Sequence, residues 1–323
     1  MKEINKYILR PIKAKDAKSL YRLSKQAQAG LSNLPTTKSE INALIKKSIN
    51  SFEKKQNRKK KKFIFVIEDN DEIVGISGIK ARVGVTRPYY SFNINRNEQY
   101  PFLELIEQHL GPSEIGSLFL SPNHRKQGLG RLLSLSRFLF IKCFKDEFTN
   151  IIIAELRGYL DQDNNSPFWN NLGQKFIPTS FTSADKKSIL DKTFIQKHFP
   201  KKPIYINLLK SNIEHYMKKV HPNTEAAKKL LLNENFRITN HIDIFDGGPK
   251  LECITSEIRT IKESQKKYLK DVEQPLNKSK LICNTKFQDF RCIRVSKNTT
   301  IEDIKKRLNI KSDEDVVEIE EKN

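Results

Sequence analysis

Residues 118–130 read LFLSPNHRKQGLG, and this stretch is the most informative one about the fold. Residues 114–120 predict a strand that a proline ends, and residues 129–144 predict a strongly apolar helix of about four turns. The turn between them contains Gly128 and Gly130, whose missing side chains let the backbone approach a ligand closely. Because a helix start offers free N–H groups and the positive end of a dipole, this turn is suited to binding a pyrophosphate.

The charges and the glycine spacing of this turn exclude two common kinds of phosphate-binding site. Arg125 and Lys126 add positive charge beside the glycines. No Gly-Lys-Ser/Thr follows, so the turn is not a P-loop. Its glycine spacing also differs from the G-x-G-x-x-G fingerprint of dinucleotide-binding folds. An ordinary strand–helix connection stays open as the alternative.

The composition excludes several classes of protein. The chain has 323 residues, of which 37% are apolar, and this share is enough for a folded core. No apolar run reaches the about 18 residues of a membrane span, and no secretory signal opens the sequence. The four cysteines form no C-x-x-C pair. We therefore expect a cytoplasmic protein with reduced thiols, no metal site and no membrane partner.

The net charge of +21, from 59 basic and 38 acidic residues, predicts an anionic partner. Nucleic acid is one such partner, but the 44 lysines outnumber the 15 arginines and are scattered along the chain. The densest run is residues 54–62, with seven basic residues in nine, which we interpret as a solvated loop. An enzyme for an anionic co-substrate would use the same potential, so nucleic-acid binding is the less favoured alternative.

Apolar patterns along the chain predict interleaved strands and helices, which favours a mixed α and β fold. The predicted strands are residues 7–11, 63–67, 73–83, 114–120, 151–156, 203–209, 236–245, 281–287, 290–295 and 316–319. Residues 63–83 predict a hairpin around the Asp69-Asn70-Asp71 turn, and residues 85–108 predict a second region that is either hairpin-like or a loop. The predicted helices are residues 16–27, 39–52, 129–144, 168–172 and 225–233, with a short one after Thr300. Residues 263–280 read as a connector.

The loop at residues 118–130 resembles the acyl-CoA loop of the Gcn5-related N-acetyltransferase superfamily. Six further stretches resemble the arginine N-succinyltransferase family, in that family's order, over about residues 4–260. They are GLSNLP at 30–35, AELRG at 154–158, SPFW at 166–169, PIY at 203–205, VHP at 220–222 and IDIFDGGP at 242–249. Two features depart from the family pattern, the basic run at residues 54–62 and Asn235 in place of a glycine.

The resemblance implies an α+β fold of the Gcn5-related type, with a mixed, mostly antiparallel sheet and helices on both faces. It implies an N-acyltransferase domain over residues 1–261. The CoA-binding half would be about residues 1–180, and the substrate and catalytic half about residues 181–261. A small β-rich, barrel-like domain would follow at residues 262–323. The implied reaction transfers succinyl from succinyl-CoA to the α-amine of L-arginine, the first step of arginine catabolism by the succinyltransferase pathway.

The resemblance also implies which residues act. Succinyl-CoA, a co-substrate rather than a cofactor, would be bound by Leu118, Leu120, Arg125, Gly128 and Gly130. His221 of the VHP stretch would be the catalytic proton donor. Its place before a proline predicts a helix start, where the dipole favours neutral imidazole. A neutral imidazole is a base before it is an acid, so an acid role, a base role, both, or a merely capping role stay open.

Several choices stay open on the sequence. Asp243, Asp246 and Glu155 are candidate ligands for a guanidinium, and Arg157 for a carboxylate, although each could equally form a structural ion pair. His124 borders the loop, and the remaining histidines have no motif. The acyl acceptor could be another amine such as ornithine. The oligomeric state is also open.

Overall fold

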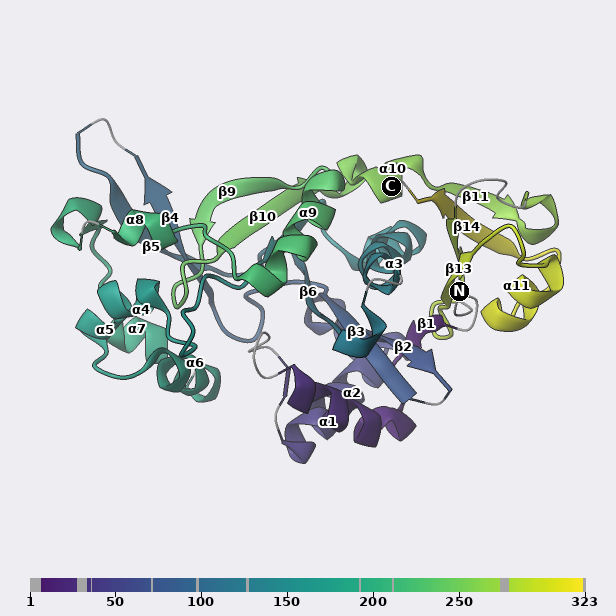
Figure 1. The fold of residues 1–323 in the computed structure, drawn as a ribbon, viewed down its shortest axis with the longest axis horizontal. Helices are drawn as coiled ribbons and strands as arrows, with labels where there is room; N and C mark the ends of the chain where they lie inside the picture. The colour runs from purple at the N-terminus through teal and green to yellow at the C-terminus, as the bar shows by residue number, and fades with distance from the viewer. Residues whose placement is uncertain are drawn as a thin grey trace. The chain divides into compact units, whose positions relative to one another are not determined.

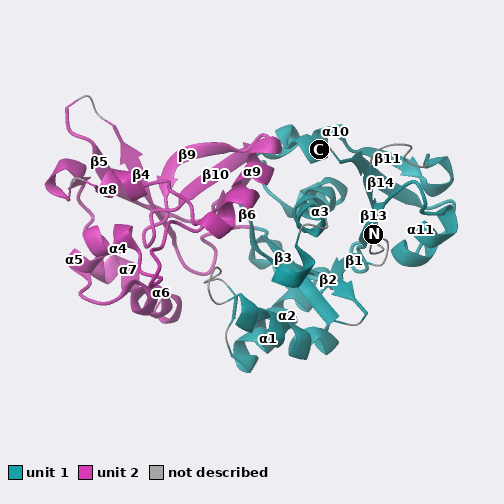
Figure 2. Cartoon of the chain, viewed as in Figure 1, with its two compact units in different colours: residues 1–81, 113–150, 254–323 teal, residues 82–112, 151–253 magenta. Residues whose placement is uncertain are grey.

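The computed structural model describes residues 7–27, 34–35, 37–70, 72–96, 99–125, 128–191, 193–210, 212–273 and 279–321. Gly30 to Asn33 of the GLSNLP stretch, Asp71 of the predicted turn and Lys126 of the predicted loop lie outside these residues. The chain forms two compact units (Figure 2). Unit 1 comprises residues 1–81, 113–150 and 254–323, and unit 2 comprises residues 82–112 and 151–253.

Unit 1 contains a sheet with helices on both faces (Figure 1). Its strands lie in the order β11-β14-β12-β13-β1-β2-β3-β6, and each neighbouring pair is antiparallel. The strands are β1 (Ile8–Pro11), β2 (Lys62–Asp69), β3 (Glu72–Lys80), β6 (Ser113–Leu120), β11 (Gln265–Tyr268), β12 (Lys280–Asn284), β13 (Cys292–Val295) and β14 (Asp315–Glu320). The helices are α1 (Ala17–Gln26), α2 (Lys38–Phe52), α3 (Leu129–Cys143), α10 (Arg259–Glu263) and α11 (Ile301–Leu308).

Successive side chains of β2 point to opposite faces of the unit 1 sheet. Ile64 and Val66 point to one face and share a buried cluster with the apolar residues of α1 and α2. Phe63 and Phe65 point to the other face, where both rings contact Phe140 of α3 at centroid distances of 5.2 and 5.0 Å. This run of five buried apolar residues thus packs against helices on both faces of the sheet, as expected for a strand covered on both sides.

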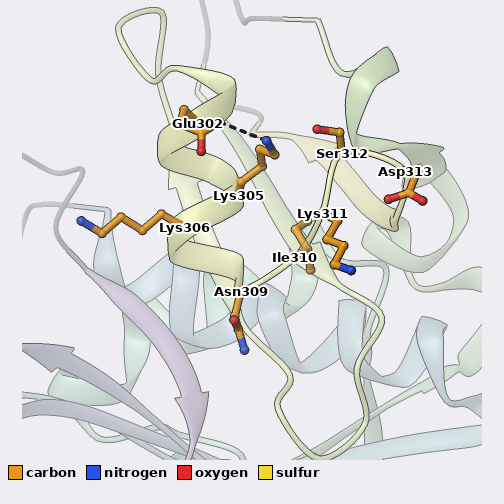
Figure 3. A pocket seen from close by; sticks show the side chains of 8 residues that line it. All are labelled: Glu302, Lys305, Lys306, Asn309, Ile310, Lys311, Ser312 and Asp313. Atoms are coloured by element: carbon orange, nitrogen blue, oxygen red, sulfur yellow. Dashed lines mark hydrogen bonds and ion pairs between the residues drawn. The ribbon is translucent and has the colours of Figure 1, made fainter.

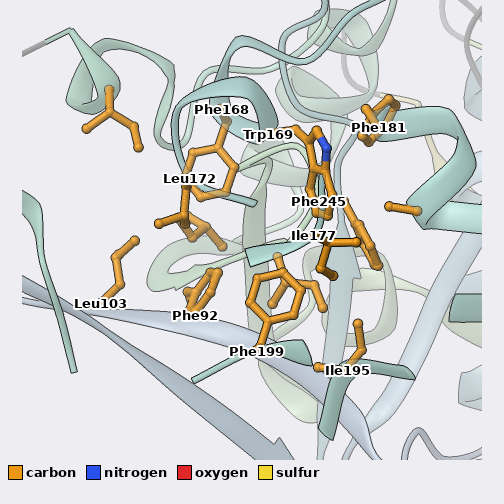
Figure 4. Close-up of a cluster of buried hydrophobic side chains, with 14 of the residues drawn as sticks. Phe92, Leu103, Phe168, Trp169, Leu172, Ile177, Phe181, Ile195, Phe199 and Phe245 are labelled. Atoms are coloured by element: carbon orange, nitrogen blue, oxygen red, sulfur yellow. The ribbon is translucent and has the colours of Figure 1, made fainter. Parts of the chain in front are cut away.

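Unit 2 has a second set of strands in the order β7-β10-β9-β4-β5-β8. They are β4 (Tyr89–Asn95), β5 (Phe102–Gln108), β7 (Ile151–Glu155), β8 (Ile204–Tyr205), β9 (Arg237–Ile242) and β10 (Pro249–Ile254). The helices are α4 (Pro167–Asn171), α5 (Gly173–Phe176), α6 (Phe181–Leu190), α7 (Phe194–His198), α8 (Ile213–Tyr216) and α9 (Glu225–Asn233). Trp169 is fully buried among aromatic and aliphatic side chains (Figure 4), and its indole N–H donates to the Thr179 carbonyl at 2.9 Å.

The predicted fold class is confirmed: the fold is α+β, with a mostly antiparallel sheet and helices on both faces. The predicted hairpin forms as β2–β3, and the region that was predicted as hairpin-like or a loop contains the antiparallel pair β4–β5. Residues 262–323 lie in unit 1, where β13 pairs with β1, and the tail strands and α11 share a buried cluster. The predicted domain boundaries after residues 180 and 261 stay predictions.

Two sequence predictions were wrong in part. The connector at residues 263–280 contains β11, which pairs with β14 along its whole length, although its residues are mostly polar. The basic run at residues 54–62 is not wholly solvated. Lys61 is buried and its ammonium lies 2.7 Å from a carboxylate oxygen of Glu147. Lys62 begins β2, where burial, together with the nearby Lys80, lowers its pKa to about 8.

The structure also has elements that the sequence patterns did not predict, namely β10, α5, α6, α7, α8 and α10. The predicted strand at residues 203–209 shortens to β8, which a 3₁₀ turn follows. Among the described residues, no helix is both long and apolar enough to span a membrane.

Candidate active site

The strand that leads into the predicted cofactor loop is interrupted by a β-bulge. Ile76 of β3 lies opposite Phe119, but Gly78 lies opposite Gly116, so two residues of β6 face one residue of β3. Ser117 at the bulge has a φ of 52°, in the left-handed region. A bulge takes one residue out of the regular ladder. The backbone around Leu118 is therefore placed for contacts outside the sheet, and residues 116–118 are only partly buried.

The loop after β6 leads directly into α3. Gly128 is the N-cap residue of α3 and has a φ of 75°, which favours glycine. A Cβ atom added to Gly130 would find no heavy atom within 4 Å, so the space beside Gly130 is open. Arg125 is exposed, and its Nε lies 3.5 Å from the Leu120 carbonyl oxygen. Leu120 itself is buried, so its contribution to a cofactor site would come from the main chain.

His221 is the N-cap residue of a 3₁₀ turn, Pro222–Thr224, in unit 2. Its Nδ1 accepts a hydrogen bond from the backbone N–H of Asn223 at 3.1 Å. Its own backbone N–H donates to the Arg157 carbonyl at 2.9 Å. Burial lowers the pKa of His221, and the nearby charge of Arg157 lowers it further. We therefore assign a neutral imidazole with its proton on Nε2, because Nδ1 is used as an acceptor.

Two of the other stretches that the sequence singled out, AELRG and IDIFDGGP, contact residues 218–221. Gly158 of AELRG forms a β-bridge with Val220, next to His221. The Lys218 N–H donates to the Gly247 carbonyl at 2.8 Å, and this bond ties the approach to His221 to the IDIFDGGP stretch. A Cβ added to Gly158 would lie 2.1 Å from the Asp246 carbonyl oxygen. Glycine is required here because two backbones pass too closely for any side chain.

The carboxylates proposed for a guanidinium have structural partners. Asp243 Oδ1 accepts from the N–H groups of Phe245 and Asp246 at 2.7 and 2.9 Å. Asp246 Oδ1 accepts from the Gly248 N–H at 2.9 Å, and its Oδ2 lies 3.5 Å from Nε of Arg157. Burial and the charge of Asp246 raise the pKa of Asp243 to about 8, so the Asp243 carboxyl is mostly protonated and neutral at pH 7.

Glu155 differs from these two aspartates in what it contacts. The Tyr89 hydroxyl donates to its carboxylate, and the Lys250 ammonium lies 5.0 Å from the centre of the Tyr89 ring. The sequence gave no signal that Tyr89 would pair with Glu155, which lies 66 residues away. The contact joins β4 to β7 within unit 2, and it can be seen only in the folded structure.

The other described histidines have ordinary partners. His124, beside the loop, lies 3.5 Å from a carboxylate oxygen of Asp69 and contacts the edge of Tyr7. His241 contacts the Ser91 hydroxyl at 3.1 Å, and burial lowers its pKa. In the described ranges, no three His, Cys, Asp or Glu side chains are grouped to hold a metal ion.

One surface hollow, of about 630 Å³, lies apart from all the predicted site residues. Glu302, Lys305, Lys306, Asn309, Ile310, Lys311, Ser312 and Asp313 line it (Figure 3). Lys305 is paired with Glu302 across it. The five predicted cofactor residues lie in unit 1 and His221 lies in unit 2. That they form one active site stays a prediction.

Comparisons with known proteins agree with the resemblance seen in the sequence. Residues 7–260 match the family model described as arginine N-succinyltransferase beta subunit. An arginine N-succinyltransferase from Escherichia coli is 36% identical over 271 residues, which cover 80% of this chain and 79% of that protein. The Escherichia fergusonii protein of the same name is 34% identical and covers 89% and 88%. Subunit AI of the arginine/ornithine succinyltransferase from Pseudomonas aeruginosa has a TM-score of 0.85 at 28% identity, over 97% and 98% of the two chains.

Proposed function

Because this chain belongs to the arginine N-succinyltransferase family, we propose that it transfers the succinyl group of succinyl-CoA to the α-amine of L-arginine. The product would be N2-succinylarginine, and the reaction would be the first step of arginine catabolism by the succinyltransferase pathway. The observation that carries this proposal is the family match over residues 7–260, which include both the cofactor loop and His221. The cytoplasm is the compartment we propose, since a reducing compartment preserves the free CoA thiol that the reaction releases.

In this proposal, the cofactor loop binds the CoA part of the substrate through its backbone. The N–H groups at the start of α3, with Gly128 and Gly130, would bind the pyrophosphate, and Arg125 would add charge at the exposed rim. The bulged backbone at Leu118 would hydrogen-bond the pantetheine arm, and Leu120 would contribute through its main chain. The bulge and the open space beside Gly130 support these assignments.

His221 would assist the chemistry as a hydrogen-bond donor. The free amine attacks the thioester carbonyl and forms the C–N bond, and cleavage of the C–S bond leaves an electron pair on sulfur. A neutral imidazole with its proton on Nε2 can donate to that sulfur, but Nε2 cannot at the same time accept the amine proton. The amine proton would reach the thiolate through solvent. The hydrogen bond from Asn223 to Nδ1 supports the donor role over the base role.

A thiol-release assay tests the proposed function. Succinyl-CoA and acetyl-CoA would be offered with arginine, ornithine, lysine and a buffer control. We expect thiol release with succinyl-CoA and arginine well above every other pair. Ornithine is included because the Pseudomonas aeruginosa protein of similar fold is named for both amino acids. Faster release with ornithine, or with acetyl-CoA, would overturn the proposed specificity. No release with any pair would favour the nucleic-acid alternative, which a DNA-binding titration would then test.

A further inference from the structure

Arg137, in the third turn of α3, is a buried arginine that no carboxylate neutralises. The residue is 3% exposed. Its Nε donates to the Ser134 carbonyl at 3.2 Å, and its Nη2 donates to the Ser134 hydroxyl at 3.0 Å. The guanidinium also lies 6.0 Å from the centre of the Phe138 ring. These contacts are all with neutral groups of its own helix, and within the described ranges no acidic side chain pairs with it.

A second arginine of unit 1 shows what a buried guanidinium ordinarily requires. Arg10 is 4% exposed, and it pairs with the carboxylates of Asp16, at 2.7 Å, and Glu68. Burial lowers the pKa of Arg137 to about 9, so its guanidinium is still protonated at pH 7. A buried cation is costly unless an anion neutralises it. Arg137 therefore lacks the anion that the equally buried Arg10 has.

The position of Arg137 on α3 relates it to the cofactor loop. Seven residues are close to two helical turns, so Arg137 lies on the same face of α3 as Gly130 and about 10 Å further along the helix. A Cβ atom added to Gly130 would meet no heavy atom within 4 Å. The face of the helix that carries the unpaired guanidinium thus begins beside open space.

The strand beside α3 gives the depth of Arg137 in the cofactor site. A Cβ atom added to Gly75 would lie 2.9 Å from Leu133 of α3 and 3.1 Å from Leu120 of β6, so these two leucines lie at one level. A short loop joins β6 to α3, and the helix therefore runs back along the strand. From Leu133 to Arg137 is about 6 Å, which equals about two residues of a strand. This step leads from the level of Leu120 to that of the bulged backbone at Leu118.

We propose that Arg137 binds the free carboxylate of the succinyl group and thereby selects succinyl-CoA over acyl donors without a charge. This inference rests on the proposed function, in which the pyrophosphate lies at the start of α3 and the pantetheine arm at Leu118. The acyl group follows the pantetheine arm on the side away from the pyrophosphate, which is the level of Arg137. Nη1 donates to no described residue, and with the second N–H of Nη2 it can bind both oxygens of a carboxylate.

Two acyl donors that differ only in the terminal carboxylate test this role. Butyryl-CoA has the carbon chain of succinyl-CoA but ends in a methyl group. We expect the wild type to bind succinyl-CoA more tightly than butyryl-CoA in calorimetry without arginine. Arg137→Met should weaken binding of succinyl-CoA by about 10- to 100-fold, the usual range for a hydrogen bond to a charged group. Its affinity for butyryl-CoA should fall by less than about twofold. The control is Arg22→Met, which removes an exposed arginine paired with Glu72 and should affect neither donor.

Stability distinguishes a ligand residue from a structural one. Arg137→Met removes a buried cation that has no anion, so the ligand-free variant should unfold at the same temperature as the wild type or at a higher one. Succinyl-CoA should raise the melting temperature of the wild type more than butyryl-CoA does, and this difference should disappear in the variant. If the methionine variant does not fold, Arg137→Gln keeps a donor for the Ser134 hydroxyl and should show the same selective loss.

Three results would overturn the inference. The first is an equal loss of affinity for both donors, which would show that Arg137 binds a phosphate of CoA or only supports the fold. The second is unchanged succinyl-CoA affinity in a folded variant, and the third is a wild type that binds the two donors equally well. A wild-type chain that binds neither donor, or that transfers no acyl group to arginine, would instead contradict the proposed function itself.

Discussion

Replacing His221 by asparagine separates its capping role from its chemical role. An asparagine side-chain oxygen can accept the Asn223 N–H as Nδ1 does now, at 3.1 Å, so the turn at residues 222–224 keeps its cap. The variant has no group in place of the Nε2–H. Losing one donor to a charge that develops in the transition state costs about 10²–10³-fold in turnover. His221→Ala should lose the same turnover and, in addition, about 0.5–2 kcal/mol of stability with the cap.

The pH dependence of the same variant distinguishes a donor from a base. The α-amine of an amino acid has a pKa near or above about 8, so turnover should rise with pH in both proteins. A donor role predicts a constant ratio of wild-type to variant turnover above about pH 6.5. Below that pH the ratio should depart from this constant value, because protonation of Nδ1 breaks the bond from Asn223 in the wild type although the Nε2–H is kept.

Stability gives an independent check on the protonation state of His221. Its pKa in the folded chain is lowered, so in the pH range just below about 6.5 the unfolded chain binds more protons than the folded one. The contribution of His221 to stability is therefore complete above that range and is lost as the pH falls through it. Chemical denaturation from pH 5 to 8 should show this loss in the wild type and not in His221→Asn. Near-normal turnover in the asparagine variant would show that His221 is only a cap, and a defect that disappears at high pH would show a base.

Three further predictions concern glycines and the basic run. Gly128→Val should weaken CoA binding measured by calorimetry, because the residue has a φ of 75° and its Cβ would collide with Arg294; unchanged affinity in a folded variant would contradict the loop assignment. Gly158→Ala should destabilise the chain by about 1–3 kcal/mol in urea, because its Cβ would lie 2.1 Å from a backbone oxygen, whereas Gly130→Ala, with nothing within 4 Å, should be neutral or stabilising. If Gly158→Ala and Gly130→Ala changed the stability equally, the close backbone packing at Gly158 would not matter. Lys61→Ala should lower the free energy of unfolding by about 3–5 kcal/mol, since it leaves the Glu147 carboxylate without its buried partner. A melting temperature equal to that of the wild type would show that the ion pair is dispensable.

Local patterns were sufficient for the elements whose side chains alternate or repeat regularly. The apolar run at Phe63–Ile67 and the helix that follows Gly128 were predicted from the sequence, because burial on both faces and helical periodicity leave a direct signal. The strand β11 left none: its residues are polar, and only pairing with β14 makes it a strand. A short polar segment has no local property that distinguishes it from a connector.

The candidate site likewise has some features that local sequence patterns predict and others that depend on the fold. The glycine turn could be recognised because glycine spacing and charge are local features. The contact of Arg294 with Gly128 could not, since it depends on how a distant strand packs against the start of α3. The state of His221 also needed the fold. Pro222 indicated a helix start, but the acceptor role of Nδ1 becomes clear only from the Asn223 N–H that contacts it.

The most direct test of this account is the identity of the product. Purified protein would be incubated with L-arginine and succinyl-CoA, and the product would be analysed by mass spectrometry and by NMR to locate the succinyl group. We expect one product, succinylated on the α-amine, in amounts equal to the CoA released. Succinyl on the guanidinium, a product formed equally fast without the protein, or CoA release without any succinylarginine would contradict it.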